Sequence, residues 1–127
     1  MTAISTGLPD IGAPFEWAVL RSGILYTAQV PIRSDGSFET GAFEQQAELT
    51  FANLFKTVRA AGGNVGDLVQ VLIYLTDAAD IPKMNEVYRR FFSAPFPVRA
   101  TFVIAALAIP GMRIEVLAQA HIAKAPG

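Results

Sequence analysis

The chain has 127 residues, which suits one domain with one hydrophobic core, and we expect that domain to span residues 1–127. Its formal net charge is -1 and it has no basic run, so electrostatic binding to nucleic acid is not expected. It contains no cysteine, which excludes disulfides, thiolate catalysis and zinc–cysteine sites.

The composition is apolar for a small domain, with 52% hydrophobic and 17% charged residues. We therefore expect part of the surface to lie against another subunit in an obligate homo-oligomer. The longest apolar runs, Val69 to Leu75 and Phe102 to Ile109, are too short to span a bilayer. The first ten residues lack the basic start and apolar stretch of a signal peptide. These features predict a cytoplasmic protein without a membrane partner.

The N-terminal half predicts a leader, a β-hairpin and a helix. Met1 to Pro14 contains glycine and proline and is expected to form the leader. Trp17 to Leu20 and Ile24 to Ala28 read as strands joined by a turn at Arg21-Ser22-Gly23. Thr40 is expected to cap a helix that runs to about Ala61, where Gly62-Gly63 ends it. The apolar face of this helix has helical spacing and comprises Ala47, Phe51, Leu54, Phe55, Val58 and Ala61.

The C-terminal half predicts a buried strand, a second helix and two further strands. Leu68 to Thr76 is rich in branched residues and has the length of a buried strand. Asp77 or Asp80 would cap the second helix, which has Pro82 in its first turn. Its buried face is expected to contain Ile81, Met84, Val87, Tyr88 and Phe91. The last strands are Ala100 to Leu107 and Met112 to Ile122, joined through Ile109-Pro110-Gly111.

The element order ββ-α-β-α-ββ indicates an α+β or α/β domain of two layers. Both helices would cover one face of a sheet of at least five strands. The other face would be bare in a monomer although its strands are apolar, so we expect it to form the interface between subunits.

Two charged residues lie in the apolar C-terminal strands. Arg99 shares a strand face with Thr101 and Val103, whereas Glu115 shares a face with Arg113, Leu117, Gln119 and His121. A hairpin that turns near Leu107 to Ala108 would place Arg99 opposite Glu115, with both pointing the same way. One interpretation is a structural salt bridge, within the chain or between subunits. In the other, Arg99 binds a substrate carboxylate through two hydrogen bonds and Glu115 holds or deprotonates a water.

Several segments resemble the RidA/YjgF/UK114 family in order and spacing, over nearly the whole chain. Pro97-Val98-Arg99-Ala100 and Arg113-Ile114-Glu115-Val116 are similar to the family's Pro-Ala-Arg-Ser/Thr segment and its Ile-Glu strand. Further similar segments are Tyr26 to Pro31, Ala60 to Gly63, Leu75 to Asp77 and Met84 to Phe92.

The resemblance implies a chorismate-mutase-like fold of the Bacillus type: a two-layer α+β domain with a mixed sheet of five to six strands and two helices on one face. It also implies a homotrimer with clefts between the subunits. The implied activity is hydrolysis of 2-imino or enamino acids to 2-keto acids and ammonia, without metal or cofactor. Arg99 would hold the carboxylate, and Glu115 would position the water together with a backbone carbonyl.

The family pattern also suggests which residues contact the substrate, and the chain departs from it at some of them. The implied substrate-binding residues are Arg99, Phe15, Thr27, Ala28, Asn85 and Thr101. Phe15 lacks the phenol hydroxyl that typical members place in the cleft, and Ala100 replaces their hydroxyl residue after the arginine. Thr101 stands where many members have cysteine. These changes do not define the side chain of the substrate, and they allow a larger or more apolar substrate.

Two other functions remain open. A non-catalytic protein could bind or sense small carboxylates such as 2-keto acids through Arg99, and a structural or chaperone-like protein could use the apolar surface. Ribonuclease activity is associated with some relatives, but the near-neutral charge gives it no support. His121 is the only histidine and gives no metal site, and Arg89-Arg90 reads as a solvated pair.

Overall fold

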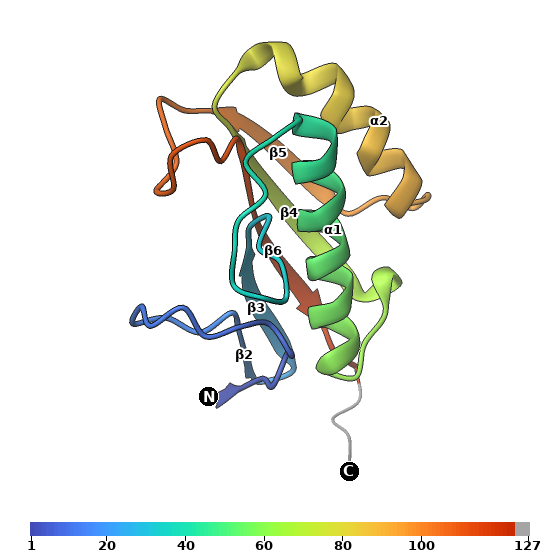
Figure 1. The fold of residues 1–127 in the computed structure, drawn as a ribbon. Coiled ribbons are helices and arrows are strands. Elements are labelled where there is room, and N and C mark those ends of the chain that lie inside the picture. Colours follow the sequence, from blue (N-terminus) through green and yellow to red (C-terminus); the bar gives the residue numbers. More distant parts are fainter. Residues whose placement is uncertain (124–127) are drawn as a thin grey trace.

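The computed structural model describes residues 1–123 as one sheet covered by two α-helices (Figure 1). The strands are β1 (Thr2–Ala3), β2 (Ala18–Arg21), β3 (Ile24–Gln29), β4 (Leu68–Leu75), β5 (Val98–Val103) and β6 (Ile114–His121). The helices are α1 (Phe43–Ala60) and α2 (Ile81–Phe91), and short 3-10 turns η1 (Val65–Asp67) and η2 (Ala78–Asp80) precede β4 and α2. The predicted elements are therefore present, with ends that differ by a few residues.

The sheet is mixed and has the strand order β1-β2-β3-β6-β4-β5. β4 and β5 run parallel, and every other neighbouring pair is antiparallel. Both helices lie on the same face of the sheet, as Figure 1 shows. The expected α+β architecture of two layers is confirmed.

The expected hairpin between the last two strands is wrong. β5 pairs in parallel with β4 at the edge of the sheet, and β6 lies on the other side of β4, between β4 and β3. The strand–helix–strand unit β4-α2-β5 needs a parallel return, because its helix carries the chain back to the starting end of the sheet. Residues 104–113 then lead past β4 to β6.

Helix α1 packs on the sheet through the predicted apolar stripe, in which Phe51, Leu54 and Val58 are buried. It ends as predicted: Gly62 has a φ of 92°, and its N–H and that of Gly63 bond to carbonyls of the last turn. The predicted Thr40 cap is wrong, since Ala42 precedes the first turn and makes no side-chain cap bond.

A row of buried polar side chains on α1 fixes the loops at one end of the sheet. Asn53 donates from Nδ2 to the carbonyl oxygens of Val30 and Ile32, at 3.1 and 2.9 Å. Gln46 donates to the carbonyl of Gly111 and accepts from the Arg113 N–H. These bonds attach the connections before α1 and before β6 to the helix.

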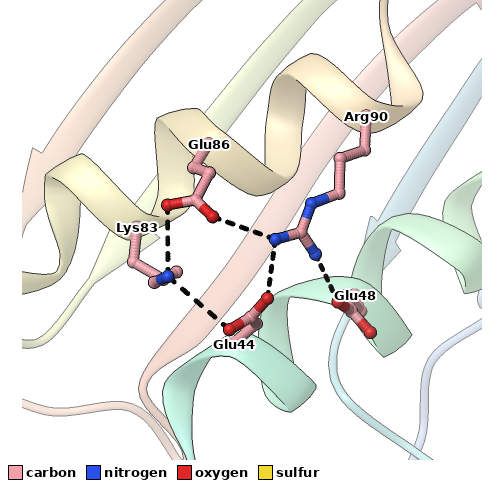
Figure 2. A network of polar contacts seen from close by, with 5 residues as sticks. All are labelled: Glu44, Glu48, Lys83, Glu86 and Arg90. Atoms are coloured by element: carbon pink, nitrogen blue, oxygen red, sulfur yellow. Dashed lines mark hydrogen bonds and ion pairs between the residues drawn. The ribbon is translucent and has the colours of Figure 1, made fainter.

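Ion pairs join the two helices on their outer side. Arg90 of α2 contacts Glu44 and Glu48 of α1 and Glu86 of its own helix, and Lys83 contacts Glu44 and Glu86 (Figure 2). The side chains are solvent-exposed to a large extent, so their energetic contribution is small and sensitive to salt. Arg90 is thus solvent-exposed, as expected for the Arg89-Arg90 pair, but it also takes part in ion pairs.

The face of the sheet opposite the helices is open and carries large apolar side chains. Tyr26, Leu117, Phe102 and Val98 are 44%, 39%, 43% and 68% exposed. We call this surface the open face. Its apolar character agrees with the expected interface between subunits.

Candidate functional site

Strand pairing directs Arg99 toward the helical layer. Arg99 pairs with Val71 of β4, which is fully buried under the helices, and paired residues point to the same face. Its guanidinium carbon lies 4.8 Å from the centre of the Tyr88 ring, and Nη1 lies 3.9 Å from the sulfur of Met84. Within residues 1–123 Arg99 forms no ion pair. Its donors therefore remain available to an anion.

Arg99 lies in a pocket of about 310 Å³ between α2 and the start of β5. The pocket is lined by Asn85, Tyr88, Arg89, Phe96, Pro97 and Arg99. The three helical residues are spaced i, i+3 and i+4, which places them on one side of α2. The structure thus brings the predicted residues Asn85 and Arg99 together, and Thr101 shares their side of β5.

Tyr88 forms the inner wall of this pocket. Its ring stacks on Phe92 at 4.1 Å and lies under the Arg99 guanidinium, an arrangement that favours the cation. Its buried hydroxyl has no hydrogen-bond partner among the described residues. Burial raises the pKa of this hydroxyl, although the positive charge of Arg99 opposes the shift. Tyr88 therefore stays neutral and supports Arg99 with its ring.

Glu115 lies on the open face. It pairs with Tyr74 of β4, whose ring stacks on Phe102 at 5.1 Å. The carboxylate is half-buried, and it makes no hydrogen bond or ion pair within residues 1–123. Removal from water raises the pKa of the Glu115 carboxyl above its ordinary value. Ala28 shares this face, because it pairs with Leu117 two residues along β6.

Arg99 and Glu115 do not meet within one chain. They point to opposite faces of the sheet and lie on strands separated by β4. The predicted pairing in one hairpin is wrong, and so is the salt bridge within the chain. One chain therefore cannot apply both groups to a single substrate.

Two other predicted residues lie away from Arg99. Thr27 is buried, and its hydroxyl donates to the Trp17 carbonyl at 2.6 Å and accepts from Gln29 at 2.9 Å. Phe15 packs edge-on against Trp17 at 4.8 Å and lines a separate pocket of about 620 Å³ formed by residues 4–17. Within one chain neither residue shares the pocket of Arg99.

Two arginines have positions that sequence reasoning missed. Arg89 lines the pocket of Arg99. Its spacing of four residues from Asn85 could have indicated this position, because such residues lie on the same side of a helix. Arg113 lies before β6 rather than on the face of Glu115, and it forms two hydrogen bonds to Asp80, at 3.1 and 2.6 Å. Asp80 therefore ties β6 to α2 instead of capping the helix.

Residues 1–123 contain neither a metal-ligand cluster nor a helix that could span a membrane. No three carboxylate or histidine side chains there are grouped to hold a metal ion. No helix in this part of the chain has the length and hydropathy needed to cross a bilayer.

A family model described as "Endoribonuclease L-PSP" matches residues 8–122. The chain is 38% identical over 117 residues to the mitochondrial protein mmf2 of Schizosaccharomyces pombe, covering 89% of this chain and 91% of that protein. It is 32% identical over 114 residues to the human 2-iminobutanoate/2-iminopropanoate deaminase, covering 88% of this chain and 82% of the human protein.

Solved structures agree with these sequence matches. RidA from the Antarctic bacterium Psychrobacter superposes with a TM-score of 0.88 and 29% identity, covering 96% of this chain and 99% of that one. Escherichia coli TdcF with bound serine superposes with a TM-score of 0.86 and 28% identity, covering 95% and 98% of the two chains. The similarity thus extends over the full sheet and both helices.

Proposed function

Because the chain belongs to the RidA/YjgF family, whose members include imine deaminases, we propose that it hydrolyses 2-imino acids to 2-keto acids and ammonia. The observation that carries this proposal is Arg99, a guanidinium in a pocket with no acidic residue in its lining. Such a group binds a planar carboxylate through two parallel hydrogen bonds. Every 2-imino acid has a carboxylate next to the reacting C=N carbon.

The reaction requires orientation more than strong chemical activation. The oxygen of a water adds to the C=N carbon, and the nitrogen retains the pair of electrons from the π bond and takes up a proton. The C–N bond of the resulting carbinolamine then breaks, ammonia leaves, and loss of the hydroxyl proton gives the keto group. Holding the carboxylate fixes the carbon with respect to the water, which lowers the entropic part of the barrier.

Glu115 would hold this water and accept its proton. Since Glu115 and Arg99 point to opposite faces of the sheet, we propose that each site combines Arg99 of one copy with Glu115 of another. The exposed apolar residues of the open face support such an assembly, for which a homotrimer with clefts between subunits is the expected form. Ala28 and the exposed Phe15 would then contribute to the cleft from the second copy, whereas Thr27 is buried on the other face and would support Ala28 only through the backbone.

The test is hydrolysis of an imine generated in situ by an amino-acid oxidase in the presence of semicarbazide. Active protein lowers the yield of semicarbazone, because it removes the imine before semicarbazide reacts. We expect Arg99→Ala to lose about 100-fold in kcat/KM, since it removes two charge-assisted hydrogen bonds to the substrate. Arg59→Ala, a change of an exposed arginine on α1, is the control and should retain activity. Equal activity of Arg99→Ala and the unchanged protein would overturn the proposal.

A second candidate function is non-catalytic binding of 2-keto acids. The separation of Arg99 from Glu115 supports it, because binding to Arg99 needs only the pocket of one chain. Binding of a 2-keto acid that disappears in Arg99→Ala, with no acceleration of imine hydrolysis, would select this function.

The cytoplasmic location remains a prediction, and the S. pombe relative mmf2 is named as mitochondrial.

A further inference from the structure

The pocket of Arg99 contains a second guanidinium, that of Arg89. Arg89 is exposed, and within residues 1–123 it forms no ion pair or hydrogen bond through its side chain. The lining has two positive charges and no negative charge. A pocket of about 310 Å³ lies at the small end of the range for small-molecule sites. The local charge is therefore suited to a ligand with two negative groups.

The neighbouring arginine shows that this arrangement is specific to Arg89. Arg90 is held by Glu44, Glu48 and Glu86 on the side of α2 that faces α1 (Figure 2). Successive helical residues point about 100° apart, so Arg89 is directed toward β5 and away from Glu44 and Glu48 of α1. Glu86 lies one turn before Arg89 but pairs with Lys83 and Arg90 instead. Glu44, Glu48 and Glu86 thus pair with Arg90, and within residues 1–123 Arg89 has no ion-pair partner.

We propose that the site selects 2-imino and 2-keto acids that carry a second carboxylate on their side chain. Arg99 binds the carboxylate next to the reacting carbon, as in the proposed function, and Arg89 binds the side-chain carboxylate at the pocket mouth. Asn85 and Phe96 line the space between them. This inference rests on the proposed function for its catalytic part, whereas the preference in binding is independent of any turnover.

The binding test compares 2-oxoglutarate with 2-oxopentanoate, which has the same chain length and a methyl group in place of the second carboxylate. Calorimetric titration should show about tenfold tighter binding of 2-oxoglutarate, the gain from one additional charge-assisted pair at a partly exposed site. Arg89→Gln should remove this difference, because the affinity for 2-oxoglutarate should fall to that for 2-oxopentanoate. Arg90→Gln is the matched control on the next residue and should retain the difference.

Equal affinity of the unchanged protein for the two keto acids would overturn the proposal. A loss of the difference in Arg90→Gln as large as in Arg89→Gln would also overturn it, because general attraction by positive charge would then explain the preference. Circular dichroism of each variant verifies that the fold is retained.

The activity arm separates this inference from the proposed function. A D-aspartate oxidase acting on D-glutamate supplies the imine with two carboxylates. A D-amino-acid oxidase acting on D-norvaline supplies an imine of equal length with one carboxylate and an uncharged side chain. We expect kcat/KM to be about tenfold higher for the imine with two carboxylates. In Arg89→Gln, kcat/KM for this imine should fall to the value for the imine with one carboxylate. Equal hydrolysis of both imines would overturn the diacid preference and leave the proposed function standing. Hydrolysis of neither would overturn the proposed function, and the titrations would still decide the preference.

Discussion

Within residues 1–123 neither Arg99 nor Glu115 has an oppositely charged partner, but their surroundings differ. Arg99 is exposed at the mouth of a pocket and lies over the Tyr88 ring, which stabilises its positive charge. Glu115 is half-buried among apolar side chains of the open face, which disfavours its negative charge. One residue is thus prepared to bind an anion and the other to accept a proton.

The pH dependence of hydrolysis should report the state of Glu115. A base must be ionised, and desolvation raises the pKa of this carboxyl above 4.5, so activity should rise with pH through a transition above that value. Glu115→Gln should abolish this transition and lower kcat by about 100-fold, while the affinity for a 2-keto acid stays within about twofold. Rate profiles and titrations measure both quantities. Gln119→Ala, on the same face, is the control and should retain the pH transition. Equal loss of binding and turnover in Glu115→Gln would instead indicate a structural role for Glu115.

Arg99 and Glu115 could be named from the sequence as candidate site residues, but their arrangement could not be predicted. The charge of Arg99 and Glu115 in apolar strands is visible in the sequence, and so is the alternation that assigns each to a face. The order of strands in a sheet depends on pairing between distant segments. This order decides which side chains of different strands can come into contact. The position of Arg89 in the pocket was indicated only by its helical spacing from Asn85, and that spacing can be interpreted only once α2 is known to lie beside the start of β5.

Among the elements, α1 supports the site by holding two connections in place. Its buried Asn53 donates to the carbonyls of Val30 and Ile32, in the connection that follows β3. The Val30 carbonyl also accepts from the Ile32 N–H, so Asn53→Ala leaves the Ile32 carbonyl as the one buried group without a donor within residues 1–123. We expect a loss of about 1–3 kcal/mol in the free energy of unfolding. Denaturant titration measures this loss. Gln45→Ala, at an exposed position of the same helix, should change stability by less than about 0.5 kcal/mol, and a similar loss in both variants would contradict the argument.

The order of the elements was more predictable than their pairing. The hydrophobic periods locate both helices and the principal strands to within a few residues, because burial acts locally on each segment. The unit β4-α2-β5 also contained the information that β5 runs parallel to β4. That β5 lies at an edge and β6 inside the sheet is seen only in the structure. Thr40 fails as a cap for a different reason: Glu39 accepts from the Gly41 N–H, and α1 begins only at Phe43.

At the scale of the whole molecule, the sheet has one face covered by helices and one open face. The open face carries both Glu115 and the exposed apolar residues, whereas the pocket of Arg99 lies on the helical side, next to the edge strand β5. A second copy that covers the open face with its β5 edge would bury apolar area and bring its own Arg99 toward Glu115. Assembly and catalysis would then depend on the same contact.

Mixing two inactive variants tests this dependence directly. Arg99→Ala chains retain Glu115, and Glu115→Gln chains retain Arg99. A cleft between one chain of each kind therefore contains both groups when the Glu115→Gln chain supplies Arg99 and the Arg99→Ala chain supplies Glu115. If equal amounts are unfolded together and refolded into cyclic trimers, random assortment gives about one complete site in four, and activity should recover to about that fraction. Each variant refolded alone is the control, and light scattering measures the assembly. Recovery cannot occur if both groups act from the same chain, because no chain in the mixture then carries an intact pair.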